Sequence, residues 1–174
     1  MAWQLFPEYL VFWDGRQISA EMFRLGFEVM TGQPDWERIL DRFAVQTIVT
    51  RASTFDTGEK FAFLDKLKGH RDWHLVFNSE SSMVFVKEGS VPADWLRRFK
   101  RSKWNVDETV LAEAHLMVKE SPDRYMAWWE MAQVYQQRQQ YQYAFAALKQ
   151  HLRRAPRPAP GAEQSYRMLS ARFQ

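Results

Sequence analysis

Apolar and aromatic residues recur at helical spacing through the second half of the chain, and this periodicity constrains the fold more than any other feature. Helices are predicted over residues 124–138 and 142–153, because apolar positions there lie three and four residues apart. Pro122 and Pro156 stand 34 residues apart and bracket the pair. Two helices joined by so short a connection pack against each other in opposite directions, so we expect a helical hairpin.

The order of residues within this hairpin resembles the tetratricopeptide repeat. The residues that carry the likeness are Trp128, Met131, Ala132, Tyr135, Ala144, Leu148 and Pro156. It covers about one and a half repeats over residues 108–156, with the helix before Pro122 acting as a preceding half repeat. The resemblance implies an all-α array that holds another polypeptide. His151 stands where a small residue is common, so looser packing is expected at that point.

The resemblance also implies a partner-binding face on the helix predicted at 124–138. The residues next to the packing stripe would line the concave groove of such arrays: Met126, Trp129, Gln133 and Gln136. An exposed tryptophan is a frequent binding anchor, and glutamine pairs with the backbone of an extended peptide. The alternative is that Trp129 is buried against the first half of the chain.

Residues 1–89 predict a separate α/β (α+β) unit with the element order β-α-α-β-α-β-β. Strands are expected at 9–13, 45–50, 73–77 and 83–86, from short runs of β-branched and aromatic residues. The second strand is expected to run parallel to the first, because a two-helix crossover separates them, which makes the small sheet mixed. Asp56 and Glu59 match a capping box for the third helix. Gly89 marks the predicted boundary with a helical unit at 90–174.

The first unit resembles the soluble C-terminal domain of bacterial polytopic glycosyltransferase-like membrane proteins. The likeness covers roughly residues 6–88 and rests on the short runs 11–16, 36–40, 45–49, 73–77 and 84–86. It implies a position on the periplasmic or extracytoplasmic side of a membrane, with a missing transmembrane region before the chain. If Met1 is the native start, the location implied is cytoplasmic. No catalytic residue transfers, because membrane segments carry the transferase chemistry of those proteins.

Three rival sites remain open at this stage. Asp14 and Arg16 flank a turn after the first predicted strand, where parallel sheets place ligands, so the first unit is alternatively a small ligand-binding domain or enzyme. Asp-Gly-Arg is also an ordinary turn sequence. His70 and His74 have a metal-like spacing, but Gly69 is expected to end the helix before them. The basic cluster binds either nucleic acid or anionic lipid, or is the solvated face of a connector: Arg97, Arg98, Lys100, Arg101 and Lys103.

Composition narrows the function classes further. The chain has no cysteine, which excludes disulfides, thiolate metal sites and cysteine nucleophiles. Residues 1–100 carry 13 basic and 14 acidic side chains, a net charge of −1, whereas residues 101–174 carry 11 and 7, a net charge of +4. That excess alone does not imply nucleic acid. The sequence therefore predicts a non-catalytic protein-binding module with no cofactor and no metal, whose partner polypeptide and oligomeric state are left open.

Overall fold

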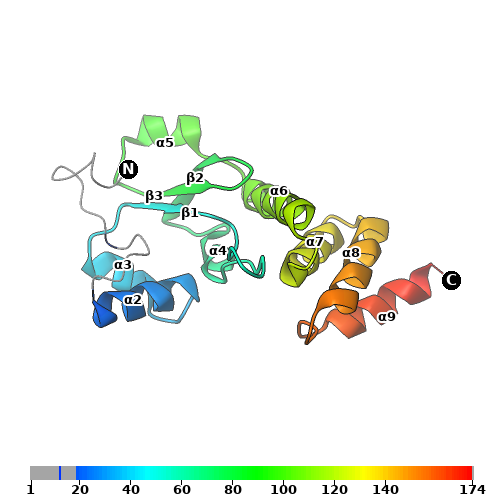
Figure 1. The fold of residues 1–174 in the computed structure, drawn as a ribbon. Helices are drawn as coiled ribbons and strands as arrows, with labels where there is room; N and C mark the ends of the chain where they lie inside the picture. The colour runs from blue at the N-terminus through cyan, green and yellow to red at the C-terminus, as the bar shows by residue number, and fades with distance from the viewer. Residues whose placement is uncertain (1–11, 13–18, 174) are drawn as a thin grey trace.

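The computed structural model describes residue 12 and residues 19–173, and it has a mixed α/β architecture. The first elements in chain order are α2 (Ala20–Met30), α3 (Trp36–Arg42), β1 (Thr47–Thr50), α4 (Phe63–Leu67), β2 (Trp73–Asn78), β3 (Met83–Lys87) and α5 (Ala93–Phe99). They are followed by α6 (Trp104–Glu120), α7 (Tyr125–Gln137), α8 (Tyr141–Arg154) and α9 (Ala162–Arg172). A small sheet is followed by a run of helices that leads away from it (Figure 1).

The three described strands form an antiparallel sheet in the order β1-β3-β2. The strands predicted at 45–50, 73–77 and 83–86 are all present, and the last two pair with each other as an antiparallel hairpin. A bulge between Leu75 and Phe77 shifts the register of β2 against β3. The first predicted strand, at 9–13, lies outside the described residues, and so does the parallel pairing expected of it.

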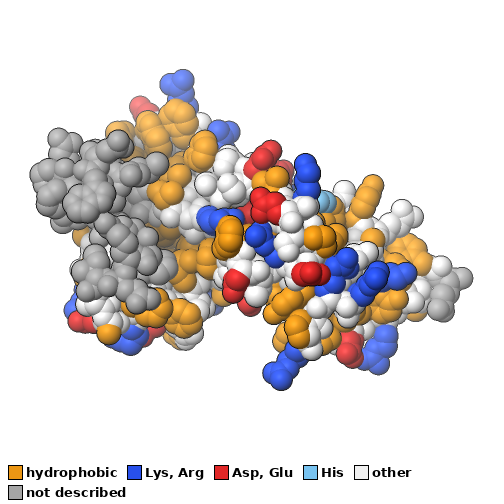
Figure 2. All heavy atoms as spheres, in the orientation of Figure 1, with side chains coloured by type: hydrophobic (Ala, Val, Ile, Leu, Met, Phe, Trp, Pro, Cys, Tyr) orange, Lys and Arg blue, Asp and Glu red, His pale blue; other side chains and the backbone are white. Residues whose placement is uncertain are grey.

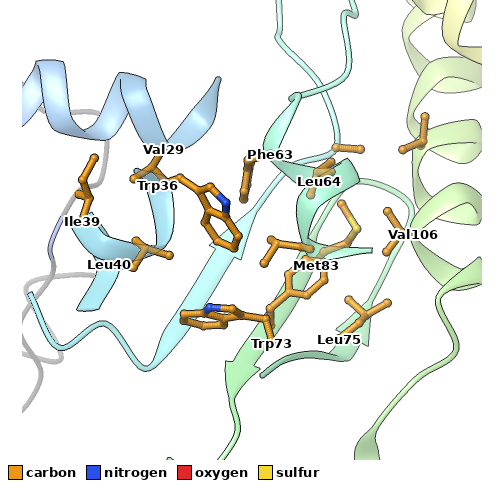
Figure 3. Close-up of a cluster of buried hydrophobic side chains, with 14 of the residues drawn as sticks. Val29, Trp36, Ile39, Leu40, Phe63, Leu64, Trp73, Leu75, Met83 and Val106 are labelled. Carbon is orange, nitrogen blue, oxygen red and sulfur yellow. The ribbon is translucent and has the colours of Figure 1, made fainter. Parts of the chain in front are cut away.

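Helices cover both faces of the sheet (Figure 1). On one face the first hydrophobic cluster joins helices α2, α3 and α4 to the strands. Trp36 of α3 and Phe63 of α4 lie in this cluster with Trp73 of β2 and Met83 of β3 (Figure 3). On the other face α5 buries Leu96 against Val76 and Val86. Alternation along the strands produces this division, because successive side chains point to opposite faces.

The third helix differs from its prediction. Asp56 and Glu59 do not cap it, because residues 53–60 form a loop closed by an isolated bridge between Ser53 and Lys60. The backbone N–H of Thr54 donates to the carbonyl of Glu59 at 2.8 Å inside this loop. The helix therefore begins later than expected, at Phe63, and is only 5 residues long.

Two clusters of buried side chains meet along α6. Val106 and Val110 of this helix belong to the first cluster, together with Val134 of α7. Farther along α6, Ala114, Met117 and Val118 belong to a second cluster, which α7, α8 and α9 complete. The predicted division at Gly89 stays a prediction, but α5 packs on the sheet and α6 contributes to both clusters.

Candidate partner-binding face of helix α7

Helices α6 to α9 form a consecutive series in which each contacts the next along the chain. The two helices predicted for the hairpin are present as α7 and α8. Their short connection includes Gln139, which has a positive φ of 59° and lets the chain reverse direction. This places the predicted partner-binding residues on a helix with packed neighbours on several sides.

The predicted packing stripe of α7 is partly as expected. Met131 and Ala132 are buried in the second cluster, whereas Trp128 and Tyr135 are only half-buried. The indole N–H of Trp128 donates to the carbonyl of Pro122 at 2.9 Å, and the Tyr135 hydroxyl lies 2.8 Å from Nε2 of His115. Trp128 therefore bonds α7 to the segment just before it, and Tyr135 bonds α7 to α6.

His151 does not loosen the packing of α8, contrary to the expectation from its size. Its side chain is fully buried and both ring nitrogens are hydrogen-bonded. Nε2 accepts from the backbone N–H of Ala159 at 2.9 Å, so Nδ1 carries the proton and donates to the carbonyl of Tyr125 at 2.8 Å. Burial lowers the pKa of the imidazole below its ordinary value, which favours this neutral form. The ring links α7, α8 and the segment before α9.

Trp129 is packed within the helical series. Its half-buried ring belongs to the second cluster, with its centroid 5.8 Å from that of His151. The residues of α7 that contact the sheet unit include Ala127, Glu130 and Val134. Among the described residues, the contacts of Trp129 lie in the helical series, and its burial against the first half of the chain stays a prediction.

Gln133 and Gln136 are the polar part of the predicted face. Both are half-buried, and in the part of the chain that the structure describes neither side chain makes a hydrogen bond within the protein. Met126 is also half-buried, and its backbone N–H is taken by the carbonyl of Thr57 at 3.1 Å. The face thus combines an anchored indole with two amides that have donors and acceptors to offer.

A surface hollow lies at the C-terminal end of α7. It has a volume of about 390 Å³ and is lined by Trp104, Glu108, Gln137 and Arg138. The indole of Trp104 is 46% exposed, with the ammonium groups of Lys68 and Lys103 at 5.1 and 5.4 Å from its centroid. Gln137 follows Gln133 by one helical turn, so the predicted face leads toward this hollow.

The basic cluster is exposed and spread over α5 and the segment after it. Arg97 pairs with Asp94, and the guanidinium of Arg98 lies 5.4 Å from the ring centroid of Phe99. The rings of Trp95 and Phe99 are tilted against each other, with centroids 4.7 Å apart, and Trp95 remains 38% exposed. Hydrophobic and basic side chains therefore lie side by side at this end of the molecule (Figure 2). Lys100, Arg101 and Lys103 are exposed as well.

The other candidate residues do not come together into a site. Asp14 and Arg16 lie outside the described residues. His70 faces Glu37 at 3.3 Å, whereas His74 is buried and faces Glu88 at 3.1 Å, so the two histidines have separate carboxylate partners. Across residues 19–173 there is no group of three side chains placed to hold a metal ion.

Sequence reasoning missed the buried carboxylates of α6 and α7, among them Glu113 on α6 and Glu130 on α7. Glu113 is 1% exposed and Glu130 is 7% exposed, and both contact the loop at residues 51–60. A signal for the first was present, because Glu113 follows Val110 by three residues and precedes Met117 by four, within the apolar stripe.

Comparisons with known proteins give no match from which a function could be inferred, so the function is argued from the residues of this chain. No family model matches the chain, and neither the curated proteins nor the solved structures include a match. Among the described helices, none is both long enough and apolar enough to span a membrane.

Proposed function

We propose that this chain is a non-catalytic protein-interaction module that binds an extended segment of a partner polypeptide along α7. The contact surface would be the face made by Met126, Trp129, Gln133 and Gln136. The observation that carries the proposal is the pair of half-buried glutamines that make no hydrogen bond within the described protein. An extended peptide backbone offers the alternating donors and acceptors that such amides pair with.

Three further observations support this assignment. Glu130 and Val134 contact the sheet unit, whereas the ring of Trp129 packs on the second cluster. The hollow beside Gln137 offers space for a side chain of the partner at the end of the same helix. The tetratricopeptide likeness of residues 108–156 agrees with the successive packing of α6, α7 and α8.

The extracytoplasmic location and the glycosyltransferase-like parent belong to the proposal as well. They rest on the likeness of residues 6–88 alone. A fusion of alkaline phosphatase to the C-terminus of the product of the complete gene distinguishes the two sides of the membrane, because the enzyme is active only where its disulfides form.

Selection from a random peptide library tests the binding function. We expect peptides enriched on the wild-type protein to bind Gln133→Ala and Gln136→Ala about 5-fold to 10-fold more weakly, since each lost hydrogen bond is worth about 1 kcal/mol. Fluorescence anisotropy with a labelled peptide measures the change. Gln164→Ala is the matched control, because Gln164 is an exposed glutamine on α9.

The library experiment has a clear negative outcome. If no peptide is enriched, or if the enriched peptides bind all three variants as tightly as the wild type, the α7 face is not the binding surface. Circular dichroism of each variant shows that the helices are intact, so that weaker binding is not a consequence of unfolding.

A further inference from the structure

The loop at residues 51–60 joins the sheet unit to two helices of the series. It leaves β1, closes on itself through the Ser53–Lys60 bridge and returns toward α4. A hydrogen bond between the hydroxyls of Thr54 and Thr57, 2.9 Å apart, holds its turn. The loop therefore has a defined shape, and it is this shape that contacts α6 and α7.

One end of the loop is anchored on α6 through Glu113. This buried carboxylate accepts the backbone N–H of Ala52 at 2.7 Å and Nε of Arg51 at 2.7 Å. The guanidinium of Arg51 balances the charge of the Glu113 carboxylate, and the Ala52 N–H gives it a second hydrogen bond. The buried charge of Glu113 therefore has both a cation and a hydrogen-bond donor as partners.

The tip of the loop rests on the start of α7. The carbonyl of Thr57 accepts the backbone N–H of Met126 at 3.1 Å. No side chain caps α7, so this carbonyl takes one of the amides that a helix start leaves without a partner. Gly58 lies so close that a Cβ placed on it would stand 2.7 Å from Cβ of Ala127.

The other end of the loop meets Glu130, and here the pairing is incomplete. The carboxylate accepts the backbone N–H of Lys60 at 3.4 Å, which is a long hydrogen bond. The ammonium group of Lys60 instead pairs with Asp65 at 2.7 Å. Among the described residues no cation lies within ion-pair distance of Glu130.

Burial therefore governs the ionisation of Glu130. It raises the pKa of the carboxyl to about 7 from an ordinary value of 4.5. The positive charge of Lys60 lowers the pKa, whereas the negative charges of Asp65 and Glu59 raise it. Glu113 is paired with Arg51. Arg124, whose guanidinium lies 4.8 Å from the ring centroid of Phe55 in the loop, is paired with Glu120.

We propose that residues 51–60 form a clasp, which is closed on α7 while the Glu130 carboxyl is neutral and opens, by losing its contact with α7, when that carboxyl ionises. The contact with α6 through Glu113 stays closed in both states and acts as the hinge. The inference does not rest on the binding function proposed above, since it concerns contacts within the chain, although Met126 takes part in both.

The direction of the pH effect follows from proton linkage. In the closed clasp Glu130 keeps its proton up to about pH 7, whereas in the open clasp the hydrated carboxyl releases it near its ordinary value of 4.5. Opening therefore releases a proton in the window between these values. Raising the pH through the window favours the open clasp, and lowering it favours the closed clasp.

Hydrogen exchange at two amides tests the clasp. The Met126 N–H reports the contact with α7, and the Ala52 N–H reports the contact with α6. After correction for intrinsic exchange, we expect opening at Met126 to increase about 30-fold between about pH 5.5 and about pH 8, given the two pKa values. Opening at Ala52 is expected to change far less. Exchange followed by nuclear magnetic resonance resolves the two sites.

Variants at Glu130 decide whether this carboxyl is responsible. Glu130→Gln keeps the acceptor without the charge, so protection of Met126 is expected to become independent of pH. Should that variant not fold, Glu130→Met removes the charge at similar volume. The proposal is overturned if wild-type Met126 shows no pH dependence, if the dependence persists in the variant, or if Ala52 opens in parallel with Met126.

Discussion

At the scale of single residues, a tight contact between the loop after β1 and α7 depends on a glycine. Gly58 has a φ of +77° and its Cα faces Ala127, whereas Gly69 has a φ of +79° and open space around the same position. The two glycines thus share a left-handed backbone but differ in their surroundings. Comparing them separates the strain of the backbone from the closeness of the contact.

We expect Gly58→Ala to destabilise the protein more than Gly69→Ala. Both variants place alanine in a left-handed conformation, at about 1–2 kcal/mol, and only Gly58→Ala forces a methyl group against α7, at about 1–3 kcal/mol more. Urea denaturation measures both free energies of unfolding. Equal losses in the two variants would contradict the tight contact between Gly58 and Ala127.

At the scale of elements, α6 connects the sheet unit to the helical series through both packing and charge. Its apolar side chains enter both clusters, and its Glu113 holds the loop after β1. A buried carboxylate is most sensitive to the loss of its cation, because the charge is then left uncompensated.

Replacing Arg51 is therefore expected to destabilise the protein more than changing Glu113 itself. Arg51→Met leaves the Glu113 charge buried without its cation and is expected to lose about 3 kcal/mol. Glu113→Gln keeps an acceptor for the Ala52 N–H without a charge and is expected to lose about 1 kcal/mol. Thermal denaturation at neutral pH compares the two. The reverse order would show that solvent compensates the carboxylate.

The sequence predicted elements well where the apolar period is long or the strand run is short and β-branched. The helices α7 and α8 and the strands β1, β2 and β3 were all expected near their observed positions. It failed at residues 53–60, because Asp56 and Glu59 fit a capping box as well as they fit a loop. The hydrogen bond from the Thr54 N–H to the carbonyl of Glu59 belongs to the loop and not to a capped helix. The spacing of apolar residues gives no sign of this bond.

The candidate site was predictable only in part, for a related reason. Periodicity placed Trp129 and Gln133 on one side of α7, which is a local property of the helix. The side of α7 that the sheet unit covers is determined by Glu130 and Val134. Glu130 contacts Lys60, and Val134 packs in the first cluster, so both contacts are made with segments distant in the sequence. A single sequence holds no local signal for such pairings.

At the scale of the whole molecule, the shared cluster predicts that the two halves unfold together. Val106, Val110 and Val134 are buried with Phe63 and Phe85 of the sheet unit, so exposing either half exposes apolar surface of the other. We expect one unfolding transition. In calorimetry the measured enthalpy should equal the van't Hoff enthalpy, and far-ultraviolet and near-ultraviolet circular dichroism should give the same midpoint. Two separated transitions would show independent halves.

The backbone bond from Met126 to Thr57 also bears on how the chain reaches this state. The start of α7 obtains its cap from a segment made much earlier in synthesis, so local sequence alone does not complete its first turn. Contacts between distant segments close large loops and form slowly compared with local ones. Residues 51–60 would therefore leave the ribosome long before the helix that they cap has been synthesised. Until then the carbonyl of Thr57 would be hydrogen-bonded to water instead of to the Met126 N–H.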